Sequence, residues 1–189
     1  ANHELSFEMP PLALTQLNPT MLSRMLADSG IKWKVVLVSA CYSGGFIEPL
    51  KDDNTLIITA SDATNTSFGC EASSKITWFS QAYFDEALRT TRSFIGAFVA
   101  ASAAVLEREK SLGYSPSNPQ IHLGAAMKSK LEALERRLES TDPGRPAVHA
   151  AVVGHGIVLR AAVVPLGDGV GAPAEAALEL GLGHLGPQL

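Results

Sequence analysis

Short apolar runs alternate with longer amphipathic stretches over the first two thirds of the chain. Lys34–Ala40 is a continuous run of mostly β-branched residues, and Leu56–Ala60 is a second run of the same type. Runs like these are typical of strands buried on both faces of a parallel sheet. A third strand is predicted at Pro119–Leu123, after a turn rich in proline and serine.

Four other segments have the spacing of helices. Asn18 suits an N-cap before Pro19 at the first helical position, and Gly30 suits the end of a helix that runs to about Asp28. Three later helices are predicted at Phe79–Leu88, Ser93–Leu112 and Ala126–Glu139. The inward residues expected of the last two are Phe94, Phe98, Val105 and Leu112, then Met127, Leu131, Leu134 and Leu138. Helices that alternate with strands predict α/β layers around a mostly parallel sheet.

Composition divides the chain into two parts. All the aromatic residues lie between Phe7 and Tyr114, and the stretch 140–189 is dominated by Gly, Ala and Pro. We therefore predict a folded unit over 1–139 and a weakly ordered appendage over 140–189.

Charge and cysteine content exclude several classes of protein. Lys and Arg total 15 against 19 Asp and Glu, for a net charge of −4, so we expect no nucleic-acid partner. The charged fraction, 18%, is too low for a disordered polyelectrolyte. Two cysteines cannot build a disulfide framework. No apolar run reaches the roughly 18 residues of a membrane span, so no membrane segment is expected in this chain.

The segment with the clearest chemistry is Ser39-Ala-Cys-Tyr-Ser-Gly-Gly45, at the end of the first predicted strand. Ligands of parallel α/β sheets bind beyond the carboxyl ends of the strands, which is where Cys41 is expected. Its thiol is a candidate nucleophile and its amide a candidate oxyanion donor. Gly44 and its neighbour are expected to let the chain turn and to leave room for a peptide. The alternative is a small buried cysteine that only caps the strand.

This segment resembles the nucleophile motif of legumain-like cysteine peptidases, a family of the caspase clan, and is most similar to the bacterial branch. The likeness continues in order through Ile57–Cys70, Thr77–Tyr83 and Ser117–Gly124, so that it covers roughly residues 3–124. The resemblance implies a caspase-like three-layer sandwich with a mostly parallel sheet. It also implies proteolysis by thiolate attack on a peptide carbonyl, through an acyl-enzyme, with a peptide or protein as substrate and no cofactor.

The same family uses a histidine from a His-Gly motif upstream of the cysteine, and no His-Gly precedes Cys41. Three interpretations are open. The chain is the C-terminal part of the catalytic domain, whose base lay before Ala1; or His3 acts as the base; or the chain is an inactive relative that serves as a binding or structural module. Such a module would expose a sheet edge along Val35–Ala40.

The remaining histidines do not complete the site by sequence order. His155-Gly156 follows Cys41 instead of preceding it, and it lies in the composition-shifted tail with His149 and His184. His122 is expected to pack in the third strand. The histidines and cysteines lack the spacing of metal ligands, so no metal is expected.

Position in the resemblance assigns a substrate pocket to Thr66, Ser67 and Phe68; a polar loop with an aromatic anchor explains these residues equally well. Ser39 and Gln81 stand where the family has acidic residues, which puts a preference for Asn before the scissile bond in doubt. Asp62 is a candidate replacement charge, and Cys70 is expected to be a packed structural thiol. Localisation stays open: the resemblance suggests a bacterial protein, cytoplasmic, or periplasmic or membrane-associated if an N-terminal anchor was lost.

Overall fold

The computed structural model describes residues 3–6, 11, 16–69 and 76–141. Three strands form one sheet, β1 (Lys34–Val38), β2 (Thr55–Thr59) and β3 (Gln120–Leu123). The longer helices are α1 (Pro19–Asp28), α5 (Phe94–Ser111) and α6 (Ala125–Thr141). Shorter helical segments are η1 (Ser43–Phe46), α2 (Ile47–Leu50), α3 (Trp78–Ser80), the π-helix η2 (Gln81–Ala87) and α4 (Leu88–Thr90).

The sheet has the order β1-β2-β3, with β1 parallel to β2 and β3 antiparallel to β2. The chain approaches β3 from the edge of the sheet at which β2 ends, because the Asp62 N–H donates to the Ser117 carbonyl 3.0 Å away. Entering at that edge, β3 can only run back along β2. The sheet is therefore parallel between its first two strands and antiparallel between the second and the third.

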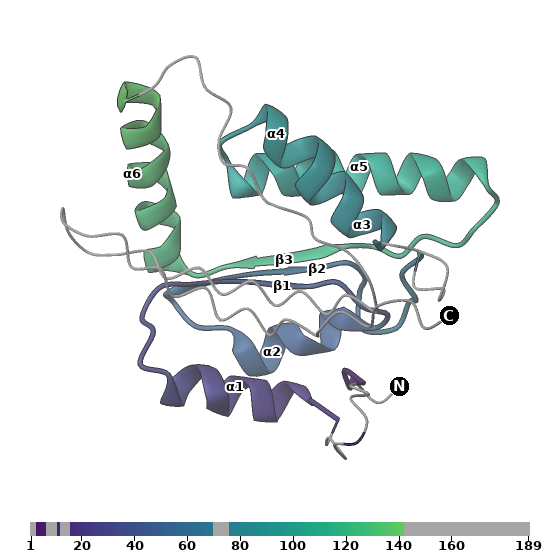
Figure 1. Ribbon diagram of the computed structural model, residues 1–189, viewed down its shortest axis with the longest axis horizontal. Helices are drawn as coiled ribbons and strands as arrows, with labels where there is room; N and C mark the ends of the chain where they lie inside the picture. The colour runs from purple at the N-terminus through teal and green to yellow at the C-terminus, as the bar shows by residue number, and fades with distance from the viewer. Residues whose placement is uncertain (1–2, 7–10, 12–15, 70–75, 142–189) are drawn as a thin grey trace.

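Both faces of the sheet are covered by helices, as Figure 1 shows. Val36, Val38 and Ile57 point to the side of α1 and α2, where they pack with Leu22 and Phe46. The alternate strand residues point to the other side, against the layer of α3, η2, α4 and α5; they are Val35, Leu37, Leu56 and Ile58. Alternate residues of each strand thus contribute to two different cores. The expected α/β class with three layers is confirmed.

Several predicted boundaries and contacts differ in detail. The helix predicted at Phe79–Leu88 spans three segments and includes seven residues of π-helix. Leu112 was expected to face inward, but it is 55% exposed because α5 ends one residue before it. The inward position near that end belongs to Glu109, which is buried. Beyond α6, the predicted appendage falls outside the described residues from 142 onward.

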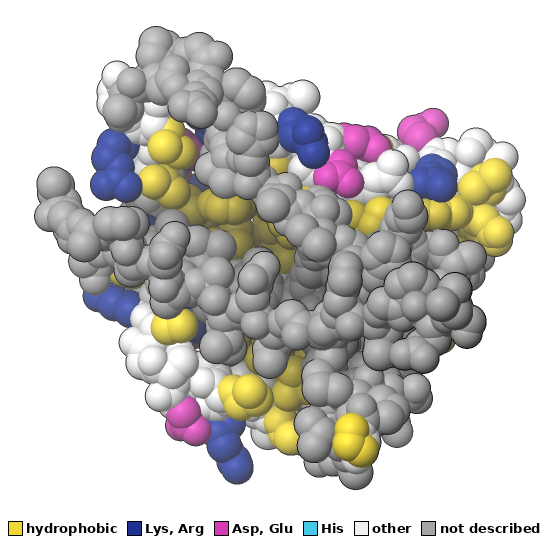
Figure 2. All heavy atoms as spheres, in the orientation of Figure 1, with side chains coloured by type: hydrophobic (Ala, Val, Ile, Leu, Met, Phe, Trp, Pro, Cys, Tyr) yellow, Lys and Arg dark blue, Asp and Glu magenta, His cyan; other side chains and the backbone are white. Residues whose placement is uncertain are grey.

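Charged side chains of both signs are interspersed over α4 and α5 on the face drawn in Figure 2. This is the usual outer surface of helices that pack by one side only. Among the described residues, no helix is long and apolar enough to cross a bilayer.

Candidate active site

Cys41 lies directly beyond the carboxyl end of β1, where the strand gives way to a turn. Its side chain is partly buried. The thiol Sγ donates to the carbonyl of Ser67 at 3.4 Å, and the Ser67 hydroxyl donates back to Sγ at 3.8 Å. Because β1 and β2 are parallel, both end at this edge, and the loop after β2 reaches the thiol.

A tight turn follows the cysteine. Tyr42 has a left-handed backbone with φ of 59°, and η1 begins at the next residue. The Tyr42 N–H donates to the carbonyl of Asn65 at 2.9 Å. A Cβ at Gly44 would lie 2.6 Å from the backbone of Asp62 and Ala63. Glycine at this position therefore lets the loop after β2 pack against the turn, and room for a substrate beside Gly44 stays a prediction.

Two buried serines join these loops. The Ser43 N–H donates to the Ser61 hydroxyl, and the Ser61 N–H donates to the Ser43 hydroxyl, each at 3.1 Å. The Ser61 hydroxyl also lies 3.1 Å from the carbonyl of Ala40. The pair was not predicted. The only signal for it was that Ser43 and Ser61 each follow a strand end.

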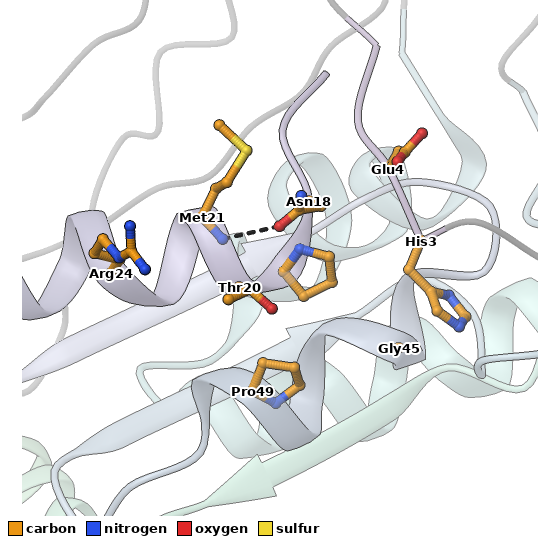
Figure 3. Close-up of a pocket in the computed structure, with 9 residues that line it drawn as sticks. His3, Glu4, Asn18, Thr20, Met21, Arg24, Gly45 and Pro49 are labelled. Atoms are coloured by element: carbon orange, nitrogen blue, oxygen red, sulfur yellow. Dashed lines mark hydrogen bonds between the residues drawn. The ribbon is translucent and has the colours of Figure 1, made fainter. Parts of the chain in front are cut away.

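His3 lies against the same turn. Its Nδ1 is 2.9 Å from the Tyr42 carbonyl, and its ring packs on Gly45 so closely that a Cβ there would overlap it. A carbonyl oxygen only accepts, so Nδ1 carries the hydrogen and the lone pair of the neutral ring is on Nε2. The structure thus brings His3 to the segment that follows Cys41. Figure 3 shows His3 beside Gly45.

The sequence that forms these loops matches a known protein family. The model of the Peptidase C13 family matches residues 2–129. The chain belongs to the Peptidase C13 family. This is the legumain family of the caspase clan, so the expected family is confirmed. No curated protein matches the chain.

Membership in the Peptidase C13 family supports a cysteine peptidase in general and a protein substrate. The match includes every residue of the Cys41 site described above, from His3 to Ser67. It ends within α6 and leaves the Gly- and Pro-rich stretch outside.

The residues predicted for the substrate pocket have different surroundings in this Peptidase C13 chain. Ser39 is buried, and its hydroxyl lies 2.6 Å from that of Thr77, the N-cap of α3. Ser67 is buried against Cys41, whereas Thr66 is exposed. Gln81 is partly buried at the first position of the π-helix.

Phe68 belongs to an aromatic cluster. Its ring stacks on Tyr114 with centroids 4.7 Å apart and lies 5.2 Å from Trp78. The Arg108 guanidinium lies over the Trp78 ring at 4.1 Å. Phe68 is thus the aromatic anchor of a loop, as one of its two interpretations expected; a role in substrate binding stays a prediction.

Asp62, expected as a replacement charge in the pocket, has its oxygens engaged by its own loop. They accept from the Thr64 and Asn65 N–H groups at 2.7 Å each. Burial acts to raise the pKa of Asp62, but the hydrogen bonds from Thr64, Asn118 and Asn65 outweigh it and lower the pKa to about 2.

Other candidates lie away from this site or outside the described residues. His122 is partly buried on β3, paired with Ile57. Cys70 and the three histidines after residue 141 are not among the described residues. Within the described part of the chain, no three His, Cys, Asp or Glu side chains gather as metal ligands.

A pocket of about 430 Å³ lies next to His3, which forms part of its lining. Figure 3 shows its walls, which come from the N-terminal end of α1, from η1 and α2, and from the segment at His3 and Glu4. The residues that line it include Gly45 but not Cys41. The pocket therefore adjoins the turn after Cys41 without including Cys41 itself.

Proposed function

We propose that this chain carries the nucleophile of a cysteine peptidase and that Cys41 is that nucleophile. The observation that supports it most directly is the position of Cys41 at the carboxyl end of β1, in a turn matched by the Peptidase C13 family. A thiolate needs little activation to attack a carbonyl.

The reaction follows from the chemistry of the thiolate. Sγ attacks the carbonyl carbon of a peptide bond and forms a tetrahedral oxyanion. The C–N bond then breaks, the amine leaves with a proton, and an acyl-enzyme remains. Water attacks this thioester, releases the new carboxyl group and restores the thiol. The Cys41 amide is the proposed oxyanion donor.

His3 is the proposed general base within this chain. Its Nδ1–H donates to the Tyr42 carbonyl, which leaves Nε2 with a lone pair that can accept a proton. Of the two histidines in the described part, His3 is the one that contacts the turn after Cys41.

The experiment is labelling with a peptidyl acyloxymethyl ketone across pH, in the natural chain and in Cys41→Ala, Cys70→Ala and His3→Asn. Asn places its Nδ2 donor where His has Nδ1, so His3→Asn keeps a donor to Tyr42 and removes the base. We expect selective labelling of Cys41 with an apparent pKa below the usual value of about 8.5. We also expect His3→Asn to slow it.

A non-catalytic binding module is the second candidate, favoured by the position of β1. The Lys34 N–H and the Val38 carbonyl bond to the β2 side, so the backbone groups of Val35 and Leu37 point away from β2. Within the described residues β1 is the outer strand on that side. Slow labelling at an ordinary thiol pKa, equal at both cysteines, would favour this function over the peptidase.

A further inference from the structure

The loop from Asp62 to Ser67, here called the thiol loop, holds the Cys41 segment at three points. The Ser67 carbonyl and hydroxyl both contact Sγ. The Asn65 carbonyl accepts the Tyr42 N–H at 2.9 Å. The place of Sγ therefore depends on the conformation of this loop.

Asp62 organises the thiol loop through both of its carboxylate oxygens. Oδ1 accepts from the Thr64 N–H and the Asn65 N–H at 2.7 Å and from the Thr64 hydroxyl at 3.0 Å. Oδ2 accepts from the side-chain amides of Asn65 at 2.7 Å and Asn118 at 3.1 Å. Oδ1 thus bonds only inside the loop, whereas Oδ2 also bonds outside it.

The outside partner is fixed to α5. Asn118 has a left-handed backbone with φ of 54°, a conformation that Asn and Asp tolerate better than other side chains. Next to it, the Ser117 N–H donates to the carboxylate of Glu109 at 3.1 Å, and Glu109 is 1% exposed on α5. The Ser117 carbonyl accepts the Asp62 N–H at 3.0 Å. A continuous set of bonds thus runs from α5 through Asp62 to the thiol loop.

We propose that Asp62 is a positioning residue for Cys41, which acts by tying the thiol loop to Asn118. The proposal rests on the function of Cys41 proposed above. It assigns the carboxylate to the geometry of the nucleophile and not to recognition of a substrate side chain.

Exchanging the side chains at positions 62 and 118 tests the bond between Asp62 and Asn118. Asp62→Asn keeps the Oδ1 acceptor but turns its amide toward the side-chain amides of Asn65 and Asn118, so that donors meet donors. Asn118→Asp sets two carboxylates against each other. The double variant restores an amide–carboxylate bond between positions 62 and 118 with the two groups exchanged. The amide at 62 still faces the Asn65 amide, so the expected recovery is partial. Asp28→Asn, at an exposed site at the end of α1, is the matched control.

The first readout is the ratio of two rates at Cys41, with a peptidyl acyloxymethyl ketone and with iodoacetamide, which needs no bound pose. We expect each single variant to lower this ratio about tenfold, as loss of one charged hydrogen bond implies. We expect the double variant to return to within about threefold and the control to be unchanged. Ratios within about twofold of the natural chain in both single variants, or no recovery in the double, would overturn the proposal.

Hydrogen exchange of the Tyr42 amide is the second readout and does not depend on peptidase activity. Its bond to Asn65 should open more often in each single variant, with exchange about tenfold faster, and close again in the double. If the natural chain shows no preference for the peptidyl reagent, the proposed peptidase function fails. The exchange rate of the Tyr42 amide then decides alone. An exchange rate that is higher in both single variants and returns toward the natural value in the double variant supports the positioning role. Any other pattern overturns it.

Discussion

At the scale of single residues, Gly44 shows how tightly the two loops of the site pack. A methyl group there would lie 2.6 Å from the backbone at Ala63, so the loop after β2 would have to move. We expect Gly44→Ala to lower the free energy of unfolding by about 2 kcal/mol or more and to slow labelling of Cys41. Urea denaturation and the labelling rate measure the two effects.

Gly96 offers the matched substitution. Gly96 lies near the start of α5. A methyl group added there would lie 3.3 Å from the side chain of Ser93, whereas one at Gly44 would meet backbone atoms. Gly96→Ala should change stability by about 1 kcal/mol or less, because alanine favours a helix over glycine. Equal losses in the two variants would contradict the close packing argued for Gly44.

The lowered pKa of Asp62 implies that the free energy of unfolding depends on pH. Its pKa in the folded chain is about 2, below the value of about 3.9 for an unfolded Asp, so the unfolded state binds more protons between these values. The stability that this carboxylate contributes is complete above about pH 4 and is lost as the pH falls through about 2. Urea denaturation over this range should show a shallower loss in Asp62→Asn than in the natural chain. Parallel curves for the two proteins would show that Asp62 contributes nothing to the acid sensitivity.

The sequence places some of these residues and not others. Cys41 and its glycines follow an obvious apolar strand, so their position at a strand end was predictable. The bond between Asp62 and Asn118 joins residues 56 positions apart and depends on the antiparallel course of β3. Neither motif nor periodicity contains that information. From the sequence, Asp62 was a candidate for a charged group in the substrate pocket. Only the contacts of its two carboxylate oxygens show that it organises the loop that follows β2.

At the scale of elements, Thr77 connects the end of β1 with the start of α3. Its hydroxyl lies 2.6 Å from that of Ser39 and accepts the Ser80 N–H at 3.2 Å as the N-cap. We expect Thr77→Val to lower the free energy of unfolding by about 2 kcal/mol or more, because two buried polar groups lose their partner. Thermal or urea denaturation measures this loss.

Thr77→Ser is the control, because serine keeps the hydroxyl and removes only a methyl group. It should retain most of the stability, within about 1 kcal/mol of the natural chain. A Thr77→Val variant as stable as Thr77→Ser would mean that neither the cap nor the contact with Ser39 contributes.

The elements themselves follow from the sequence to different degrees. The strands β1 and β2 and the helices α1, α5 and α6 each have a strong apolar pattern or cap, and their bounds agree with the predicted ones to within two residues. The π-helix at Gln81–Ala87 was not predicted, since the apolar pattern of this segment does not distinguish a π-helix from an α-helix.

At the scale of the whole molecule, the cores on the two faces of the sheet hold the strands at whose carboxyl ends Cys41 lies. One core joins the sheet to α5, η2 and α6, and the other joins it to α1 and α2. The loops of the site emerge between these layers, so the thiol loop can be tied to α5 while the turn at Gly45 contacts His3. A three-layer arrangement thus explains why residues distant in sequence meet at one strand end.

The same layering predicts the effect of removing residues 142–189. In the described part, the buried apolar residues of both cores lie between Leu5 and Leu131, and the family match ends at residue 129. We propose that the stretch 142–189 is an appendage and expect the chain cut after Thr141 to keep its free energy of unfolding within about 1 kcal/mol. Its Cys41 should react with the peptidyl reagent at an unchanged rate. A large loss of stability would place part of the core in the removed stretch, whereas a loss of labelling at unchanged stability would mean that the stretch contributes to the site itself.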